Sequence, residues 1–99
     1  MERVPEAFEF DWDQQNTRHL KRHKVTPEEF EEIILSDHLE LDYQFERGEE
    51  RFKVLGMTRS GRILIVVWTL RGEIIRAVTA YRASRRHERL LRESWGEEP

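Results

Sequence analysis

The chain has 99 residues, of which 37% are hydrophobic and 37% charged, and its formal net charge at pH 7 is -3. A chain of this length buries about two-thirds of the surface that it exposes when unfolded, which predicts one domain spanning residues 1–99, with an ordered core over about 7–93. The absence of cysteine excludes disulfides and thiolate metal sites. No apolar run reaches the roughly 18 residues of a membrane-spanning helix. The acidic segment 1–8 lacks the basic and apolar parts of a secretion signal, so we expect a cytoplasmic protein.

The segment 7–32 predicts a short strand followed by the first helix. Residues 7–11 alternate apolar and acidic side chains, as in an edge strand. Asp13 is expected to cap a helix that runs to about Lys24, with its carboxylate accepting from the amide of Gln15 or Asn16.

A second helix is predicted over 27–35. Thr26 is its expected N-cap, and Glu29 completes a capping box three residues later. Val25 and Phe30 have the spacing of a hydrophobic staple across this helix start.

On a helical wheel, the polar residues Asn16, His19 and His23 share a stripe with Leu20, whereas Lys21 lies opposite. Leu20 is the only aliphatic anchor of this helix. If it faces a sheet, the two histidines are at least partly covered, either by structural partners or in a groove between helix and sheet.

Four strands are predicted downstream of the second helix. Residues 39–45 alternate apolar and polar side chains, which indicates a strand with one buried face. A second strand is expected over 51–58, and the unbroken apolar run in 62–70 is typical of a central strand covered on both faces. Residues 73–81 would pair with it and complete a meander.

A final helix is predicted over 83–93, capped by Thr79 or Ser84 and anchored by Leu90 and Leu91. The predicted fold class is therefore α+β, with two N-terminal helices and a C-terminal helix packed on a mainly antiparallel sheet that contains a β-meander.

Charge is distributed unevenly along the chain. Between Glu28 and Glu50 all charged residues except Arg47 are acidic, and the segment from Arg51 to Arg92 is predominantly basic. If the sheet and the last helix place these basic residues on one face, that face could bind phosphate despite the acidic total charge. The alternative interpretation is that they are ordinary solvated residues.

His19 and His23 are four residues apart on a helix, a spacing that allows two imidazoles to reach one metal ion. A third ligand is not evident, and the catalytic glutamate of the HExxH motif is missing, so no metal site and no cofactor are predicted. The open alternatives are structural histidines bonded to backbone or carboxylate groups, or imidazoles with an acid-base or phosphate-contacting role.

Arg76 shares one face of its predicted strand with Ile74 and Val78. Its guanidinium therefore either pairs with a buried carboxylate or opens into a groove. Tyr81 and Arg82 follow where the strand passes into the last helix, a position suited to stacking on a base and holding a phosphate.

Three motifs resemble the BrnT family of type II toxins: the run WDxxNxxHxxRHxVTPEEFEE at 12–32, the strand pair ILIVVWT-x-RG-x-IIR at 63–76, and TAYRASRRHE at 79–88. The resemblance covers roughly 8–92. It implies a fold similar to that of the RelE ribonucleases, an RNA-cleaving activity that arrests translation, and neutralisation by a BrnA-type antitoxin with a DNA-binding domain. Toxin and antitoxin together would repress their own operon, so contact with operator DNA is expected only through the antitoxin.

The favoured hypothesis is a metal-independent endoribonuclease that acts on free or ribosome-bound RNA. The alternative is a catalytically inactive RNA- or antitoxin-binding module on the same scaffold. Two groups of residues are candidates. The catalytic candidates are His19, Arg22, His23, Arg76 and Tyr81. The substrate-binding candidates are Lys21, Lys53, Arg82, Arg85 and Arg86.

Overall fold

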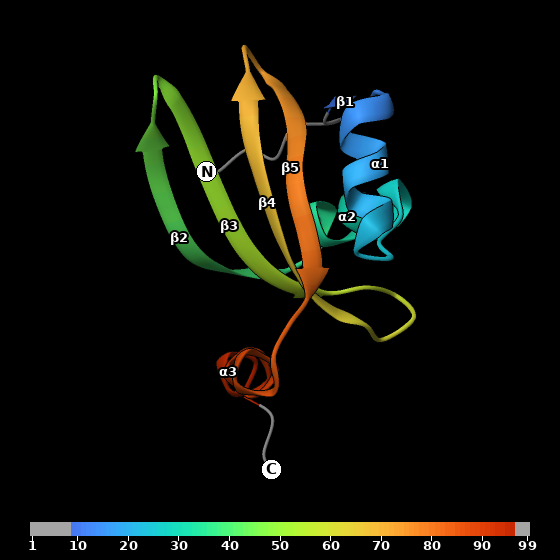
Figure 1. Ribbon diagram of the computed structural model, residues 1–99. Helices are drawn as coiled ribbons and strands as arrows, with labels where there is room; N and C mark the ends of the chain where they lie inside the picture. Colours follow the sequence, from blue (N-terminus) through green and yellow to red (C-terminus); the bar gives the residue numbers. More distant parts are fainter. Residues whose placement is uncertain (1–8, 97–99) are drawn as a thin grey trace.

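The computed structural model describes residues 9–96, and the predicted α+β architecture is confirmed (Figure 1). Two helices precede a four-strand meander, and a third helix follows it. The elements in chain order are β1 (Phe10–Asp11), α1 (Gln14–Arg22), α2 (Pro27–Leu35), β2 (His38–Glu46), β3 (Glu49–Met57), β4 (Ile63–Arg71), β5 (Ile74–Arg82) and α3 (Arg85–Ser94).

The described strands form one five-stranded sheet in the order β1-β5-β4-β3-β2. The β2–β5 meander is antiparallel, whereas β1 pairs in parallel with the start of β5. The prediction that the apolar strand β4 is central is confirmed. The short edge strand is also confirmed at Phe10 and Asp11, and the predicted positions Ala7 and Phe8 lie outside the described residues.

Local capping signals fixed both N-terminal helices as predicted. The Asp13 carboxylate accepts from the Asn16 amide, and the Asn16 side chain in turn accepts from the Asp13 amide. Thr26 and Glu29 form the same reciprocal pair at the start of α2. These bonds satisfy amides at the helix starts that have no partner within the helix.

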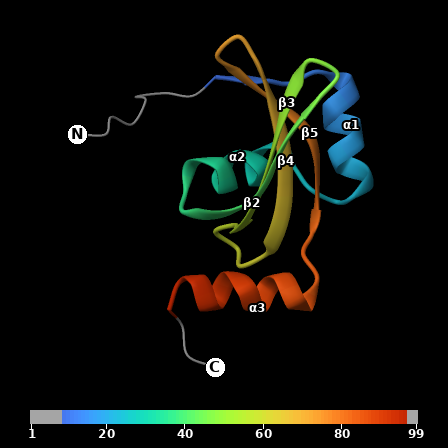
Figure 2. The same cartoon turned by 90° about the vertical axis from the view of Figure 1, so that its left-hand side faces the viewer.

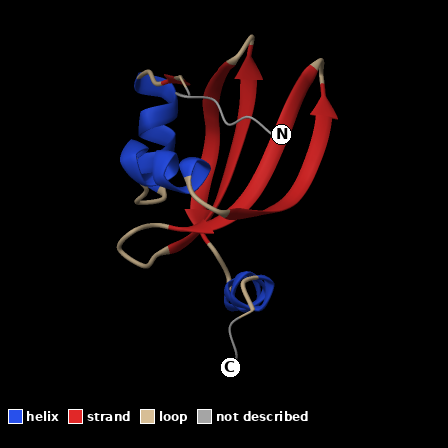
Figure 3. Cartoon of the chain, turned by 180° about the vertical axis from the view of Figure 1, so that it is seen from behind, coloured by secondary structure: helices blue, strands red, loops and turns tan. Residues whose placement is uncertain are grey.

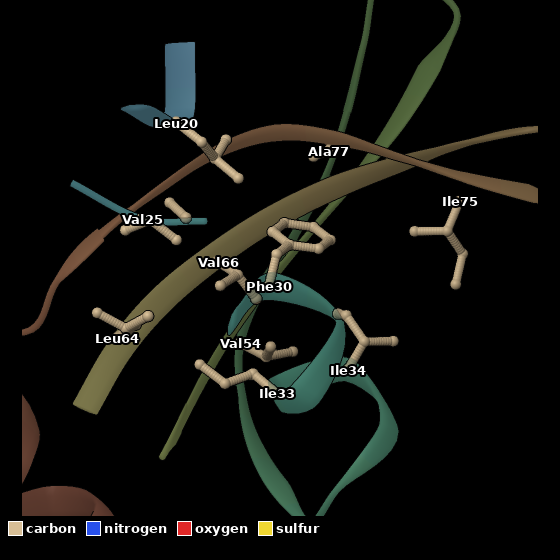
Figure 4. Close-up of a cluster of buried hydrophobic side chains, with 11 residues drawn as sticks. Leu20, Val25, Phe30, Ile33, Ile34, Val54, Leu64, Val66, Ile75 and Ala77 are labelled. Carbon is tan, nitrogen blue, oxygen red and sulfur yellow. The ribbon is translucent and has the colours of Figure 1, made fainter. Parts of the chain in front are cut away.

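The sheet has a hydrophobic cluster on each side. The helix α2 crosses one side, and α1 stands along the β5 edge (Figures 1 and 3). The first cluster contains fully buried side chains from both helices and the sheet: Phe30 and Ile33 of α2, Leu20 of α1 and Val66 of β4 (Figure 4). The staple residue Val25 belongs to the same cluster.

The second cluster lies at the end of the sheet next to α3, which runs beneath the strands (Figure 2). Leu91 of α3 is fully buried there against Leu55 and Ile65, whereas Leu90 is 42% exposed. Only one of the two predicted leucine anchors therefore enters the core. Of the two proposed caps of this helix, Ser84 accepts from the His87 amide.

The prediction that β2 buries one face along its length is wrong. The register of β2 against β3 shifts between Glu40 and Asp42. Leu39 therefore packs against the second cluster, next to α3. Tyr43 and Phe45, by contrast, are 52% and 66% exposed. A bulge reverses the alternation of side chains, so a regular apolar pattern in sequence is divided between two faces.

Substitution of Gly56 by Ala is expected to destabilise the fold by about 1–3 kcal/mol. A Cβ atom added to Gly56 of β3 would lie 2.7 Å from Cγ2 of Ile33 on α2. The midpoint of urea-induced unfolding should fall without a change in slope. An unchanged midpoint would mean that α2 does not pack this closely on the sheet.

Candidate active site

A hollow of about 380 Å³ lies between α1 and the strands β3, β4 and β5. We call it the α1 hollow. Its polar lining includes four arginines, a histidine and a threonine. These residues are His19, Arg22, Arg51, Thr69, Arg71 and Arg76.

Asn16 fixes α1 against the sheet edge. Its side chain is 4% exposed, and its Nδ2 donates to the Asp11 carbonyl at 2.8 Å while its Oδ1 accepts from the Asp13 amide at 2.9 Å. Because Asp11 belongs to β1, the bond to its carbonyl ties the first turn of α1 to the strand that pairs with β5. The predicted burial of Asn16 is therefore structural in origin.

Two histidines and a tyrosine follow one another along the α1–β5 boundary. His19 Nε2 lies 3.0 Å from the Thr79 hydroxyl, and the His19 and His23 ring centroids are 5.4 Å apart. The His23 ring lies 6.2 Å from the Tyr81 ring. The structure thus brings three of the five catalytic candidates together on adjacent elements.

The expectation that both histidines are covered holds only for His19, which is half-buried. His23 is exposed, because α1 ends at Arg22 and His23 occupies its C-cap position.

Arg76 is 8% exposed and makes two ion pairs through Nη1. The partner atoms are Asp13 Oδ2 at 2.9 Å and Asp11 Oδ2 at 3.2 Å. The hydrogen bond that Arg76 donates to the Asp13 carboxylate is the main cause that raises the pKa of Arg76. The predicted groove is present, because the guanidinium borders the α1 hollow. The predicted carboxylate partner is also present, but the Asp11 and Asp13 side chains are 39% and 47% exposed and not buried.

Sequence reasoning missed two polar groups in the α1 hollow. Thr69 is 1% exposed, and its hydroxyl has no hydrogen-bond partner among the described residues. Arg51 pairs with Glu49 at 3.2 Å through Nη2, but its buried Nε likewise lacks a partner there. Thr69 ends the apolar run of β4 and gives no sequence signal of its own, and Arg51 counted only as one of many basic residues.

The five substrate-binding candidates do not form one cluster. Lys21 and Arg85 are exposed on α1 and α3. Lys53 lines a different hollow beside Tyr43 and Trp68. Arg82 lies in a hollow with Arg62 and Glu88, and Arg86 in one on α3 with Arg89.

Within residues 9–96, no group of three or more His, Asp or Glu side chains is arranged to hold a metal ion. No helix in this part of the chain is long and apolar enough to cross a membrane.

The fold and the α1 hollow define a small α+β protein with paired imidazoles beside a group of arginines. A family model described as the ribonuclease toxin BrnT of type II toxin-antitoxin systems matches residues 12–87. The chain belongs to this BrnT family, and the resemblance seen in the sequence motifs is confirmed. Membership of a type II toxin-antitoxin family implies an antitoxin partner. A comparison with curated proteins gives no match.

The Asp13 carboxylate should make folding stability depend on pH. The Asn16 amide and then the Arg76 guanidinium lower the pKa of Asp13 below its ordinary value of 3.8. The carboxylate therefore stabilises the fold above that value, and this stabilisation is lost as the pH falls through the lowered pKa. Urea midpoints measured from pH 6 down to about pH 2.5 should decline in that acidic range.

Asp13→Asn is the matched variant, because an asparagine still caps α1 but carries no charge towards Arg76. We expect a lower midpoint at pH 6 and a shallower acidic decline than in the wild type. Parallel pH profiles for the two proteins would contradict a charged interaction between Asp13 and Arg76.

Proposed function

We propose that this BrnT-family protein is a metal-independent endoribonuclease whose reacting groups lie along the boundary of α1 and β5. The observation that carries the proposal is the pair of imidazoles, His19 and His23, with ring centroids 5.4 Å apart. An imidazole titrates near neutral pH and can act as base or acid. Two adjacent imidazoles therefore provide both functions without a bound ion.

In the proposed reaction, one imidazole accepts the proton of the RNA 2′-hydroxyl as its oxygen attacks the adjacent phosphorus atom. The bond from phosphorus to the 5′-oxygen breaks, and the other imidazole donates a proton to that oxygen. The products are a 2′,3′-cyclic phosphate and a 5′-hydroxyl end. His23 is the exposed ring and so the more accessible to RNA, while the Thr79 hydroxyl orients His19.

Arg22 and Arg76 are proposed to stabilise the negative charge that grows on the phosphate oxygens. Both border the α1 hollow next to His19. Tyr81, whose ring lies against His23, is proposed to stack on a base next to the cleaved bond.

The remaining basic candidates would contact the RNA backbone outside the reacting centre. These residues lie on several elements: Lys21, Lys53, Arg82, Arg85 and Arg86. Such a distribution suits an extended, salt-dependent contact with RNA better than binding in a single pocket. Cleavage of cellular RNA, free or on the ribosome, would arrest translation.

Replacement of His19 or His23 by Ala is expected to reduce RNA cleavage by about 10²–10⁴-fold, because each change removes one proton-transfer group. The measurement is the single-turnover rate on a labelled RNA in the presence of EDTA. His87→Ala is the matched control, since His87 lies on α3 and bonds to Ser84. Equal rates for all four proteins would contradict the assignment.

Expression of the same variants without an antitoxin gives a second measurement. The wild type and His87→Ala should arrest growth, whereas His19→Ala and His23→Ala should not. A wild-type protein that binds RNA with a steep salt dependence but leaves it intact, with and without ribosomes, would instead support the inactive binding module.

The partner is proposed to be a BrnA-like antitoxin that carries the DNA-binding domain of the pair. An acidic or amphipathic antitoxin segment would fold over the arginines of the α1 hollow and block access to RNA. Operator DNA would then be contacted only by the antitoxin.

Arg22→Glu is expected to weaken binding of the protein encoded by the adjacent reading frame by at least about tenfold, since it reverses a charge at the hollow. Titration calorimetry at two salt concentrations measures the change, with Arg59→Glu, on the loop after β3, as the control. Equal affinities for both variants would place the antitoxin on another surface.

A further inference from the structure

A row of polar side chains crosses the sheet at the floor of the α1 hollow. Thr69 of β4 pairs with Arg76 of β5, and Arg76 pairs with Asp11 of β1. On the other side, continuation of the β3–β4 register beyond its last pair, Phe52 and Trp68, places Arg51 next to Thr69. Neighbouring strands are about 4.8 Å apart, so the two arginines flank the threonine at a separation of about 10 Å.

A carboxylate anchors each of the two arginines through one terminal nitrogen. Glu49 holds Nη2 of Arg51 at 3.2 Å, and Asp11 and Asp13 both hold Nη1 of Arg76. These contacts hold one terminal nitrogen of each guanidinium and leave its other N–H groups for a further acceptor.

The centre of the row contains unpaired donors. The Thr69 hydroxyl is buried and has no partner among the described residues, and the same is true of the Arg51 Nε. A buried polar group without a partner is costly, so such groups are rare unless a ligand completes them. The missing partner must accept hydrogen bonds from an N–H and an O–H between two cations, which is the chemistry of a phosphate oxygen.

We infer that Arg51, Thr69 and Arg76 form a phosphate-binding subsite that holds one backbone phosphate of the RNA substrate. The inference rests on the proposed ribonuclease function and adds a contact to it. The phosphate that Arg51 and Thr69 hold is not the one that is cleaved. Arg76 lies between the two phosphates, because only its Nη1 is held by carboxylates of the described residues and its other N–H groups serve both.

Thr79, which contacts His19, lies further along β5. Because Val78 is an extra residue at the register shift against β4, Arg76 and Thr79 are two paired positions apart, or about 7 Å at roughly 3.3 Å per residue. The subsite therefore sets the register of the RNA relative to the imidazoles.

Thr69→Val tests the inference with little change of shape. Because the hydroxyl has no partner within residues 9–96, its removal should leave the melting temperature unchanged or raise it. Affinity for RNA should nevertheless fall by about tenfold, since a hydrogen bond to a charged oxygen is lost. A variant that is at least as stable as the wild type but binds RNA more weakly has lost a ligand contact.

The probe is an eight-nucleotide RNA with 2′-O-methyl groups throughout, which the proposed reaction cannot cleave. Its affinity is measured for the wild type, Thr69→Val, Arg51→Gln and the charge-matched control Arg59→Gln. Arg51→Gln should also reduce the slope of log affinity against log salt by about one, as expected for one lost phosphate contact. Arg59→Gln should bind like the wild type.

A set of probes with one neutral methylphosphonate linkage at successive positions identifies the phosphate. At one position the neutral linkage should lower the RNA affinity of the wild type by about tenfold. The same linkage should not lower the affinity of Thr69→Val further, because that variant has already lost the contact. Inorganic phosphate at millimolar concentration serves as a separate arm. Weak competition by phosphate that Thr69→Val abolishes would support the subsite, and equal competition against both proteins would oppose it.

The results separate the subsite from the proposed cleavage. If the methylated RNA depends on Thr69 and Arg51 for binding but the unmodified RNA is not cleaved, the subsite stands and the ribonuclease proposal fails. If RNA is cleaved and neither variant alters affinity or the methylphosphonate pattern, the subsite is wrong and the ribonuclease proposal stands. A Thr69→Val protein that melts well below the wild type would also overturn the subsite, because its hydroxyl would then have a structural partner.

Discussion

The buried guanidinium of Arg76 is the point at which three elements of this protein meet. It lies on β5, and its two partners come from β1 and from the N-cap of α1. A buried cation without partners would be strongly unfavourable, so the sheet edge and the helix start must both be in place when Arg76 is enclosed. Asp13 links the start of α1 to β5, because its Oδ1 caps the helix while its Oδ2 pairs with Arg76. Together with the bond from Asn16 to the Asp11 carbonyl, this contact positions His19 and His23 relative to β5.

The same pattern of an arginine held by a carboxylate occurs twice across the α1 hollow, at Arg51 with Glu49 and at Arg76 with two aspartates. Each carboxylate reduces the local positive charge and so weakens attraction for an anion at a distance. In exchange, the long arginine side chains lose less conformational freedom when a ligand binds. A chain with a net charge of -3 can therefore present a phosphate-binding surface through placement of a few cations.

Sequence reasoning predicted the features that depend on neighbouring residues. Both helix starts, the central position of β4 and the unusual setting of Arg76 follow from capping residues or alternation, which act over a few residues. The partners of Arg76 could not be predicted in this way, because Asp11 and Asp13 are distant in sequence and meet it only through the parallel pairing of β1 with β5. The exposure of Tyr43 and Phe45 was missed for a similar reason, since a bulge is not evident in an alternating pattern. Tyr81 and Arg82 were grouped by sequence proximity, although consecutive strand residues point to opposite faces.

The candidate site was thus only partly predictable. The imidazoles were identified because their spacing on a helix is visible in the sequence. Thr69 was not, because its importance lies in what surrounds it. An unpaired buried hydroxyl lowers the stability of the free protein by about 1–3 kcal/mol. Valine at this position would remove that cost and would suit β4, whose other buried residues are mainly aliphatic. A threonine with no partner within the described residues, placed between two anchored arginines, is therefore explained by the ligand that it binds, since donors already desolvated and oriented in the free protein need no rearrangement when a phosphate enters.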